Sequence, residues 1–276
     1  MKIFVTGATG FIGSHFINAA LRDGHEIIAF KRKNSIPRVK IKGSITWVEG
    51  VLGDPVEHYM NECEVLVHFA AYGVSPQKTT WEDAFYWNVN QSIKTWKMAI
   101  KSGVKHIIIS GSAAEYGLSS VDYKYIPISA NLEPIGPYAT SKVCSFIAAK
   151  ELCRSHNVKL TYFRVFSAFG EGQYKYNLWP SLKKAALNGE DFKMTPGEQV
   201  LDFIDVKDVV KFFIDALQYD LENYDKISVK NVGSGNPQTV REFSQYWWKY
   251  WSAEGEINVG AIPYRVDEVM RIVPEI

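Results

Sequence analysis

The stretch Lys2–His15, KIFVTGATGFIGSH, decides the fold of this chain. A short apolar run leads directly into Gly7, Gly10 and Gly13, and an amphipathic segment follows them. Glycines in this arrangement permit a tight turn, close approach of the backbone to a pyrophosphate, and close packing of the helix on the strand. The free amides at the start of the helix then attract the anion. We therefore predict a strand, a phosphate-binding loop and a helix that form a dinucleotide site, with a purely structural turn as the alternative.

The same alternation of short apolar runs and longer amphipathic segments continues through the first two thirds of the chain. The predicted strands are Ile3–Val5, Ile27–Phe30, Ile45–Val48, Val65–Phe69, Ile107–Ser110 and Leu160–Val165. Helices are clearest at Phe11–Asp23 and Val89–Ser102. This alternation predicts a Rossmann-like α/β fold, a doubly wound parallel sheet with helices on both faces.

After Gly170 the alternation loosens, which indicates a second structural unit. We expect a helix over Asn177–Gly189, a strand and a helix in DFIDVKDVVKFFIDAL, a strand in ISVKNVGSG, and a helix opened by the capping-box spacing Thr239–Glu242. The predicted organisation is a dinucleotide-binding domain over residues 1–168, to which the strand and helix of 200–232 return, and a smaller interleaved substrate lobe over 169–199 and 233–276. Because VMRIVPEI ends the chain within an apolar pattern, we expect that a last element is missing.

Composition excludes several classes of protein. The net charge is +1 and the basic residues are scattered, so nucleic acid and anionic membrane surfaces are not expected partners. The three cysteines lack CxxC spacing, which argues against a disulfide framework and a zinc site; no metal is expected. No apolar run is long enough to span a bilayer, and MKIFVTGATG lacks the features of a signal peptide. We expect a cytoplasmic protein.

Cations follow the second predicted strand, in AFKRKNS. An acid at this position would bind the ribose hydroxyls of NAD, but the chain carries Lys31, Arg32 and Lys33 instead. Cations suit the 2′-phosphate of NADP, so NADP (NADPH) is the predicted cofactor. A solvated basic loop is the alternative.

The segment PYATSKVC places Tyr138 and Lys142 four residues apart, on one face of a helix. The ammonium is expected to favour the phenolate and so to lower the pKa of Tyr138. Ser112 follows a predicted buried strand 26 residues before Tyr138. Two independent features at this spacing predict that Ser112, Tyr138 and Lys142 form a catalytic group.

At this point the chain resembles the extended short-chain dehydrogenase/reductase family in its nucleotide-sugar branch. The resemblance covers nearly all 276 residues. It rests on GATGFIG, HFAAYG, NVNQS, the S-x-x-x-YG of SGSAAEYG, YxxxK, FRVFSAFGEG, GEQVLDFIDVKDVV and NVGSG. It implies an enzyme that binds a nicotinamide dinucleotide and a nucleotide sugar and that forms a homodimer.

The resemblance also implies roles for individual residues, which the residue patterns above support in part. Ser112, Tyr138 and Lys142 are the expected catalytic residues. The expected cofactor-binding residues are Gly7, Thr9, Gly10, Phe11, Ile12, Gly13, Arg32, Lys33, Leu52, Phe69, Ala70, Ala71, Asn88, Ser110, Tyr138, Lys142 and Phe166. The expected substrate-binding residues are Tyr72, Ser75, Ser112, Ala113, Ser167, Asn177 and Arg265.

Two positions depart from the family pattern. Leu201 stands where the family commonly has an arginine that contacts the diphosphate, so Arg265 is expected to carry more of that contact. Val51 stands where many relatives have an adenine-binding aspartate, and Asp54 is not an evident substitute.

The two residues after Ser112 bear on the reaction. The 4,6-dehydratases of the family have Asp and Glu at this place, whereas this chain has Ala113 and Ala114, which cannot transfer a proton. We therefore predict NADPH-dependent reduction of the 4-keto group of a dTDP-, CDP- or GDP-linked 4-dehydro-6-deoxyhexose, in deoxysugar biosynthesis for surface polysaccharide such as O-antigen. An NAD-dependent nucleotide-sugar 4-epimerase is the alternative. A third hypothesis, an NADP-binding protein without chemistry, is disfavoured by the intact Tyr138 and Lys142.

Other residues leave two interpretations open. Tyr72–Pro76 and Tyr174–Trp179 either contact the sugar or form ordinary surface loops. Glu115 is expected to make a contact at a helix end or in a loop, with a sugar hydroxyl as the alternative. His68 and His106 are expected to be structural rather than catalytic. The aromatic residues between Tyr246 and Trp251 are expected to pack a helix on the core rather than to stack on a ligand.

Overall fold

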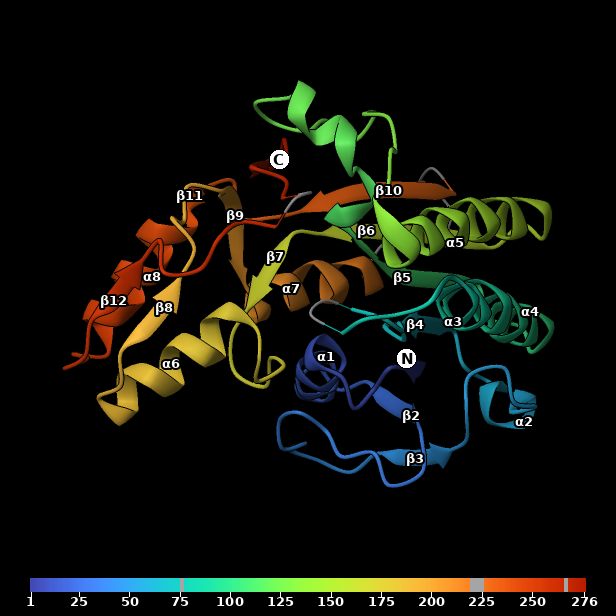
Figure 1. The fold of residues 1–276 in the computed structure, drawn as a ribbon. Helices are drawn as coiled ribbons and strands as arrows, with labels where there is room; N and C mark the ends of the chain where they lie inside the picture. Colours follow the sequence, from blue (N-terminus) through green and yellow to red (C-terminus); the bar gives the residue numbers. More distant parts are fainter. Residues whose placement is uncertain (75–76, 219–225, 266–267) are drawn as a thin grey trace.

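A seven-stranded parallel sheet forms the centre of the molecule (Figure 1). The computed structural model describes residues 1–74, 77–218, 226–265 and 268–276. The strand order is β10-β6-β5-β4-β1-β2-β3. The strands are β1 (Lys2–Thr6), β2 (Glu26–Lys31), β3 (Thr46–Glu49), β4 (Val65–His68), β5 (His106–Ser112), β6 (Lys159–Val165) and β10 (Ile227–Val232). The doubly wound α/β fold predicted from the sequence is confirmed.

Helices cover both faces of this sheet, because each strand buries apolar side chains on its two sides. On one face α1 (Phe11–Arg22) and α7 (Val206–Leu217) enclose a core that includes Phe16 and Phe213. On the other face α2 (Glu57–Met60), α4 (Ser92–Lys101) and α5 (Gly136–Ser155) enclose a second core that includes Trp96 and Phe146. Parallel strands buried on both faces read as continuous apolar runs, which is why the sequence located them.

The helix predicted over Val89–Ser102 has a more complex start. The structure has a continuous helical segment composed of α3 (Trp81–Phe85), the π-helical turn η1 (Tyr86–Gln91) and α4. The Ser92 hydroxyl donates to the Trp87 carbonyl five residues earlier, 3.1 Å away, within this wider turn. Such π-helical turns are frequent at functional sites, and this one turns the buried side chain of Asn88 toward the sheet edge.

A second lobe lies beside the sheet (Figure 1). One small sheet is built around β9 (Val200–Asp205), which pairs with β7 (Ser167–Phe169), β11 (Pro237–Thr239) and β13 (Arg271–Ile272). A second small sheet pairs β8 (Phe192–Met194) with β12 (Ile257–Val259), and α6 (Leu178–Asn188) and α8 (Val240–Tyr250) complete the lobe. Of the segment 200–232, α7 and β10 return to the central domain, whereas β9 belongs to the small sheet. The backbone of β9 pairs with β7, β11 and β13, and the fully buried Asp202 of β9 accepts from the amides of Ser234 and Gly235, which follow β10.

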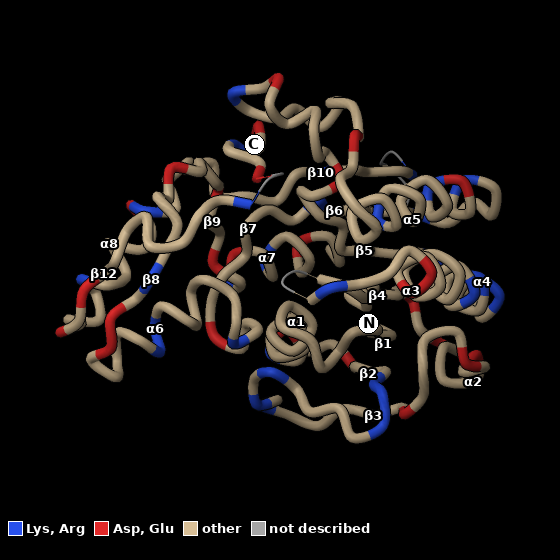
Figure 2. Tube along the Cα trace, in the orientation of Figure 1, with Lys and Arg blue, Asp and Glu red and all other residues tan. Residues whose placement is uncertain are grey.

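The aromatic cluster of α8 packs the helix against the lobe, as the sequence predicted. Trp247 makes ring contacts with Phe169, Trp179 and Trp251, at centroid distances of 5.7, 5.6 and 5.2 Å. Tyr246 and Tyr250 face outward. Within the described ranges, no helix has the length and apolar character needed to cross a membrane. Figure 2 shows Lys and Arg spread over the whole chain and interspersed with Asp and Glu.

Candidate active site

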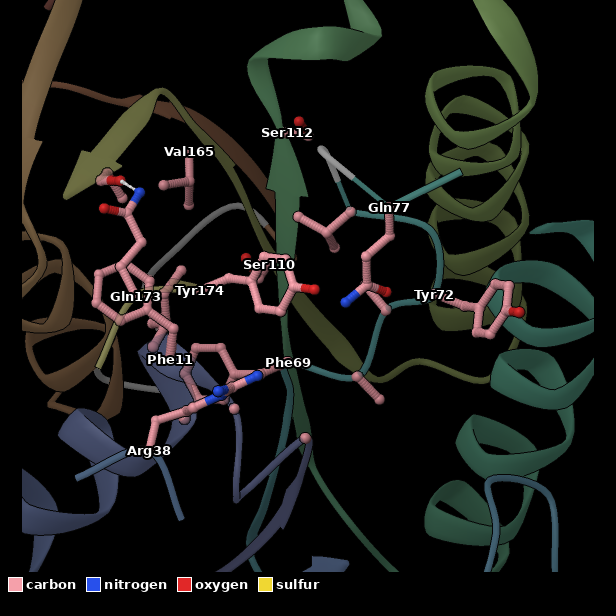
Figure 3. A pocket seen from close by; sticks show the side chains of 18 of the residues that line it. Phe11, Arg38, Phe69, Tyr72, Gln77, Ser110, Ser112, Val165, Gln173 and Tyr174 are labelled. Carbon is pink, nitrogen blue, oxygen red and sulfur yellow. Dashed lines mark hydrogen bonds between the residues drawn. The ribbon is translucent and has the colours of Figure 1, made fainter. Parts of the chain in front are cut away.

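A cavity of about 890 Å³ opens at the carboxyl ends of the central strands, between the sheet and the second lobe. Figure 3 shows Ser110, Val165 and Phe69, from neighbouring segments of the sheet edge, around this hollow. Ligands of doubly wound sheets bind at this edge. The predicted site residues that line it are Gly7, Thr9, Gly10, Phe11, Ile12, Gly13, Arg32, Leu52, Phe69, Ala70, Ala71, Tyr72, Asn88, Ser110, Ser112, Tyr138, Phe166, Ser167, Asn177 and Arg265.

Four predicted residues stand apart from this lining. Lys33 is exposed and is not part of the cavity lining, and Lys142 is buried behind it. The structure buries Ala113 to 8 % exposure in a small apolar cluster with Tyr116 and Phe166, because its methyl group faces inward from the turn after β5. Ser75 lies outside the described residues.

The glycine loop has the geometry of a phosphate cradle. Gly7 has φ +65°, and a Cβ there would lie 2.6 Å from the backbone of Phe69 and Ala70. Helix α1 has no side-chain cap at Gly10 and no acidic residue in its first turn. Its first amides therefore have no partner within the helix, and the helix dipole places positive charge beside the cavity. These residues fit the pyrophosphate of a dinucleotide.

Two arginines face the cavity beyond this loop. Arg32 follows β2, and the neighbouring Lys31 also lines the cavity but is already paired with Glu49 at 3.0 Å. Arg38, which the sequence did not single out, also lines the cavity, and its guanidinium lies 5.7 Å from the ring centroid of Tyr174 (Figure 3). In the sequence, Arg38 lies in the same basic segment that follows β2, and this segment is the feature that could have indicated Arg38 as a cavity residue.

Tyr138 and Ser112 meet at the cavity wall. Ser112 ends β5, Tyr138 lies in the first turn of α5, and a hydrogen bond with Ser112 partly opposes the rise in the pKa of Tyr138. Desolvation nevertheless raises that pKa to about 12. The expectation that Lys142 lowers the pKa of Tyr138 is therefore wrong for this structure. The reason is that the Lys142 ammonium donates to the Ser110 carbonyl at 2.8 Å, and its own pKa is lowered by burial.

Asn88 braces the loop that follows β4. Its amide oxygen accepts from the Tyr72 amide at 2.7 Å, and its amide nitrogen donates to the Tyr72 carbonyl at 3.0 Å. The same nitrogen donates to the Ser141 hydroxyl at 2.9 Å, and that hydroxyl donates to the Tyr138 carbonyl at 2.7 Å. Asn88 thus links the cavity loop to the first turn of α5.

Glu115 is fully buried, which excludes the alternative that it contacts a sugar hydroxyl. Its carboxylate is bound from several sides, including by Arg164 at 2.9 Å. His68 and His106 are also satisfied within the sheet, by Thr6 and Ser92 and by Thr161 respectively. Burial lowers the pKa of both imidazoles to about 3, so both are neutral.

The end of the cavity that faces the second lobe is rich in aromatic rings. The sequence had marked Tyr174–Trp179, but Phe169, Phe203 and Phe243 also contribute. Arg265 is exposed at the rim, and Leu201 lines the cavity nearby. Near the adenosine end of the predicted cofactor site, the Asp54 carboxylate accepts from the Val51 amide at 2.8 Å and so closes its own turn. Asp54 is absent from the lining, whereas Val51 is part of it.

The central sheet, the glycine cradle and this cavity define an enzyme fold of the extended short-chain dehydrogenase/reductase type. The chain belongs to the NAD dependent epimerase/dehydratase family, which matches residues 3–232.

Individual relatives point to two activities. The chain is 25% identical to UDP-glucose 4-epimerase of Lactobacillus helveticus over 260 residues, covering 86% of this chain and 77% of the relative. It is 26% identical to CDP-abequose synthase of Salmonella muenchen over 273 residues, covering 98% of this chain and 87% of the relative. The structure of UDP-glucose 4-epimerase with UDP-glucose from Thermotoga maritima superposes with a TM-score of 0.88 at 25% identity, covering 100% of this chain and 90% of that chain.

Proposed function

We propose that this enzyme uses NADPH to reduce the 4-keto group of a 4-dehydro-6-deoxyhexose linked to dTDP, CDP or GDP. The observation that carries the proposal is the turn after β5, where Ser112 is followed by Ala113 and Ala114. Removal of water or carbon dioxide requires further acid and base groups, and methyl groups supply none. Hydride transfer needs only a proton donor for the developing alkoxide, and in this proposal Tyr138 is that donor.

Each residue has a defined task in this proposal. The bound NADPH would supply the hydride to C4 of the sugar. Tyr138, whose pKa of about 12 keeps it protonated at neutral pH, donates its proton to the C4 oxygen. The Ser112 hydroxyl binds the same oxygen, and Lys142 holds the strand end through the Ser110 carbonyl. Arg265 and the aromatic end of the cavity receive the nucleotide diphosphate part of the substrate.

A nucleotide-sugar 4-epimerase that retains NAD is the second candidate. It is favoured by the relatives that are named UDP-glucose 4-epimerase or UDP-arabinose 4-epimerase. The same Ser112 and Tyr138 would serve it, since both reactions pass a hydride to or from C4.

One experiment separates the two candidates. Purified protein is mixed with NADPH and each of the dTDP-, CDP- and GDP-linked 4-keto-6-deoxyhexoses, and absorbance at the nicotinamide band is followed. In parallel, protein without added cofactor is incubated with UDP-glucose and UDP-galactose, and the sugars are analysed. Oxidation of NADPH with one keto sugar supports the reductase. Interconversion of the UDP-sugars, with no NADPH oxidation by any keto sugar, would establish the epimerase instead.

Selection of NADPH by Arg32 is a testable part of the proposal. Arg32→Ala is expected to raise KM for NADPH by about 10- to 100-fold and to change KM for NADH less than about threefold, because only the 2′-phosphate loses a charged partner. Lys33→Ala is the matched control, since its side chain is exposed and outside the cavity lining. Steady-state kinetics with both cofactors measure the effect. Equal changes for NADPH and NADH in Arg32→Ala would contradict the assignment.

The pH dependence follows from the raised pKa of Tyr138. The reductive reaction needs the protonated phenol, so its rate is lost only as pH rises through that pKa, which is about 12. We expect kcat for reduction to stay level from about pH 7 to about pH 10. A pH series at saturating NADPH and keto sugar measures this. A fall in kcat centred near neutral pH would show that another group limits the rate.

We also propose that the enzyme acts as a homodimer in the cytoplasm. Support for the dimer comes from α3 and α5, which pack against each other and expose large apolar side chains. Ile147 of α5 is 58% exposed, and Trp81 of α3 is 53% exposed. Exposed apolar groups on adjacent helices are typical of subunit interfaces.

A further inference from the structure

A buried ion pair lies directly behind the serine at the end of β5. The Arg164 Nε donates to the Glu115 Oε2 at 2.9 Å, and the side chains of Arg164 and Glu115 are 3% and 0% exposed. Arg164 comes from β6 and Glu115 from the 3₁₀ turn η2 (Ala113–Glu115), so the pair joins two neighbouring segments of the sheet edge.

The second oxygen of this carboxylate holds the backbone of Ser112. Glu115 Oε1 accepts from the Ser112 amide at 2.8 Å and from the Tyr162 hydroxyl at 2.7 Å. The Ser112 hydroxyl in turn accepts from the Ala114 amide at 3.2 Å, so the strand end and the turn form a capping box. The position of Ser112 therefore depends on where the Glu115 carboxylate is held.

The guanidinium on the other side has little freedom to move. Arg164 Cζ lies 4.9 Å from the ring centroids of both Tyr116 and Phe146. Its Nη1 donates to the Tyr116 hydroxyl at 3.2 Å and to the Ile128 carbonyl at 3.3 Å. A planar cation fixed between two rings and bound at its edge holds its carboxylate partner in one place.

Gly111 leaves the space that this network occupies. A Cβ at Gly111 would overlap the Tyr162 ring and lie 2.8 Å from Glu115 Oε1. The strand end thus lacks a side chain at a position where a side chain would displace Tyr162 and Glu115. The absence of a side chain at Gly111 therefore allows Glu115 and Tyr162 to pack directly against the backbone beside Ser112.

Stability alone is a weak explanation of this pair, because buried ion pairs often contribute no more than apolar residues of the same volume. Arg164 and Tyr162 hold the same carboxylate that accepts from the Ser112 amide. This convergence points to a role in the reaction. We propose that Glu115, held by Arg164 and Tyr162, is a positioning residue that fixes Ser112 for hydride transfer at the proposed site. This positioning role rests on the proposed function because it requires hydride transfer at this site. A reductase and an epimerase both transfer hydride, so the role is the same for either.

The carboxylate also acts on the charges that face the site. Burial raises the pKa of Tyr138 and the Glu115 charge adds to that rise, whereas for Lys142 burial lowers the pKa and the same charge opposes the fall. Tyr162 adjoins the same carboxylate, and the Arg164 charge lies on its far side. Removal of the negative charge therefore lowers the pKa of Tyr138 and leaves Arg164 uncompensated, which acts in the same direction.

Glu115→Gln tests the positioning role, because it keeps the volume and an oxygen acceptor but removes the charge. We expect kcat to fall by about 10- to 100-fold, with KM for both substrates within about twofold. We also expect activity to decline at lower pH than in the wild type, and a crystal structure of the variant to show Ser112 displaced from Tyr138. Glu242→Gln is the matched control: Glu242 occupies the same place in the capping box of α8, exposed and outside the cavity lining, and should leave kcat unchanged.

The outcomes separate this inference from the proposed function. No turnover of any keto sugar or UDP-sugar by the wild type means that the proposed function fails. Wild-type kcat in Glu115→Gln, or an unmoved Ser112, overturns the positioning role. A lower kcat accompanied by raised KM values for both substrates equally overturns it, since that shows a structural effect only. Where Glu115→Gln does not fold, Tyr162→Phe carries the test, because it removes one hydroxyl donor and keeps the ion pair; it should lower kcat about 3- to 10-fold with the same KM values.

Discussion

Tyr138→Phe is expected to lower kcat by about 10²- to 10⁴-fold, because the ring stays and only the proton donor is lost. The phenol lies at the cavity wall beside Ser112, and in the proposed arrangement Tyr138 donates the proton to the C4 oxygen whereas Ser112 only binds that oxygen. KM for NADPH is expected to change less than about threefold, since the glycine cradle is untouched. Stopped-flow measurement of the nicotinamide absorbance gives the rate of the hydride step directly.

Tyr174→Phe is the control for this variant. Tyr174 lines the same cavity, and its ring rather than its hydroxyl contacts Arg38, at 5.7 Å. Its kcat should stay within about tenfold of the wild type. Retention of more than about a tenth of the wild-type rate in Tyr138→Phe would show that the proton comes from elsewhere.

The elements that position the site could be predicted because local patterns determine them. The apolar runs of β1, β4, β5 and β6 are buried on both sides, and glycines mark the turn between β1 and α1. The capping box of α8, Thr239 with Glu242, also formed as predicted. In each case the residues that determine the structure lie within a few positions of one another.

Contacts between distant segments were beyond the sequence patterns. The capping box at Ser112 has the same local spacing as that of α8, yet its glutamate is buried because Arg164 and Tyr162, almost fifty residues later, meet it from β6. The local pattern predicted a loop contact, and only the pairing of β5 with β6 shows the ion pair. The same holds for the pKa of Tyr138, which depends on desolvation by the whole cavity wall rather than on the spacing to Lys142.

At the cofactor end of the cavity, too, the sequence indicated the kind of site but not which residues form it. The basic run after β2 indicated a cationic site, but the structure distributes its members differently: Lys31, Arg32 and Arg38 line the cavity, Lys31 is already paired with Glu49, and Lys33 is not part of the lining. Which cation turns inward depends on the path of the loop between β2 and β3. A pattern of charges in sequence carries no information on that path.

Gly7→Ala is expected to abolish detectable dinucleotide binding and to lower the free energy of unfolding by about 3–5 kcal/mol. The φ of +65° disfavours any residue with a Cβ, and that Cβ would lie 2.6 Å from the backbone of Phe69 and Ala70. Phe69 and Ala70 directly follow β4, which pairs with β1, so their backbone cannot move aside without displacing β4 from β1. The loop then loses the turn that presents the α1 amides to the pyrophosphate.

Gly24→Ala is the control that separates the steric clash expected in Gly7→Ala from the cost of a positive φ in a residue with a Cβ. Gly24 has φ +80°, yet a Cβ there would meet nothing within 4 Å, so only the left-handed backbone opposes the substitution. It should lower the free energy of unfolding by about 1–2 kcal/mol and leave NADPH affinity unchanged. Denaturant unfolding and calorimetric titration with NADPH measure both quantities for the two variants. Equal destabilisation in Gly7→Ala and Gly24→Ala, with intact binding in both, would show that the loop can relax away from β4 and that its close approach is not required for the cofactor.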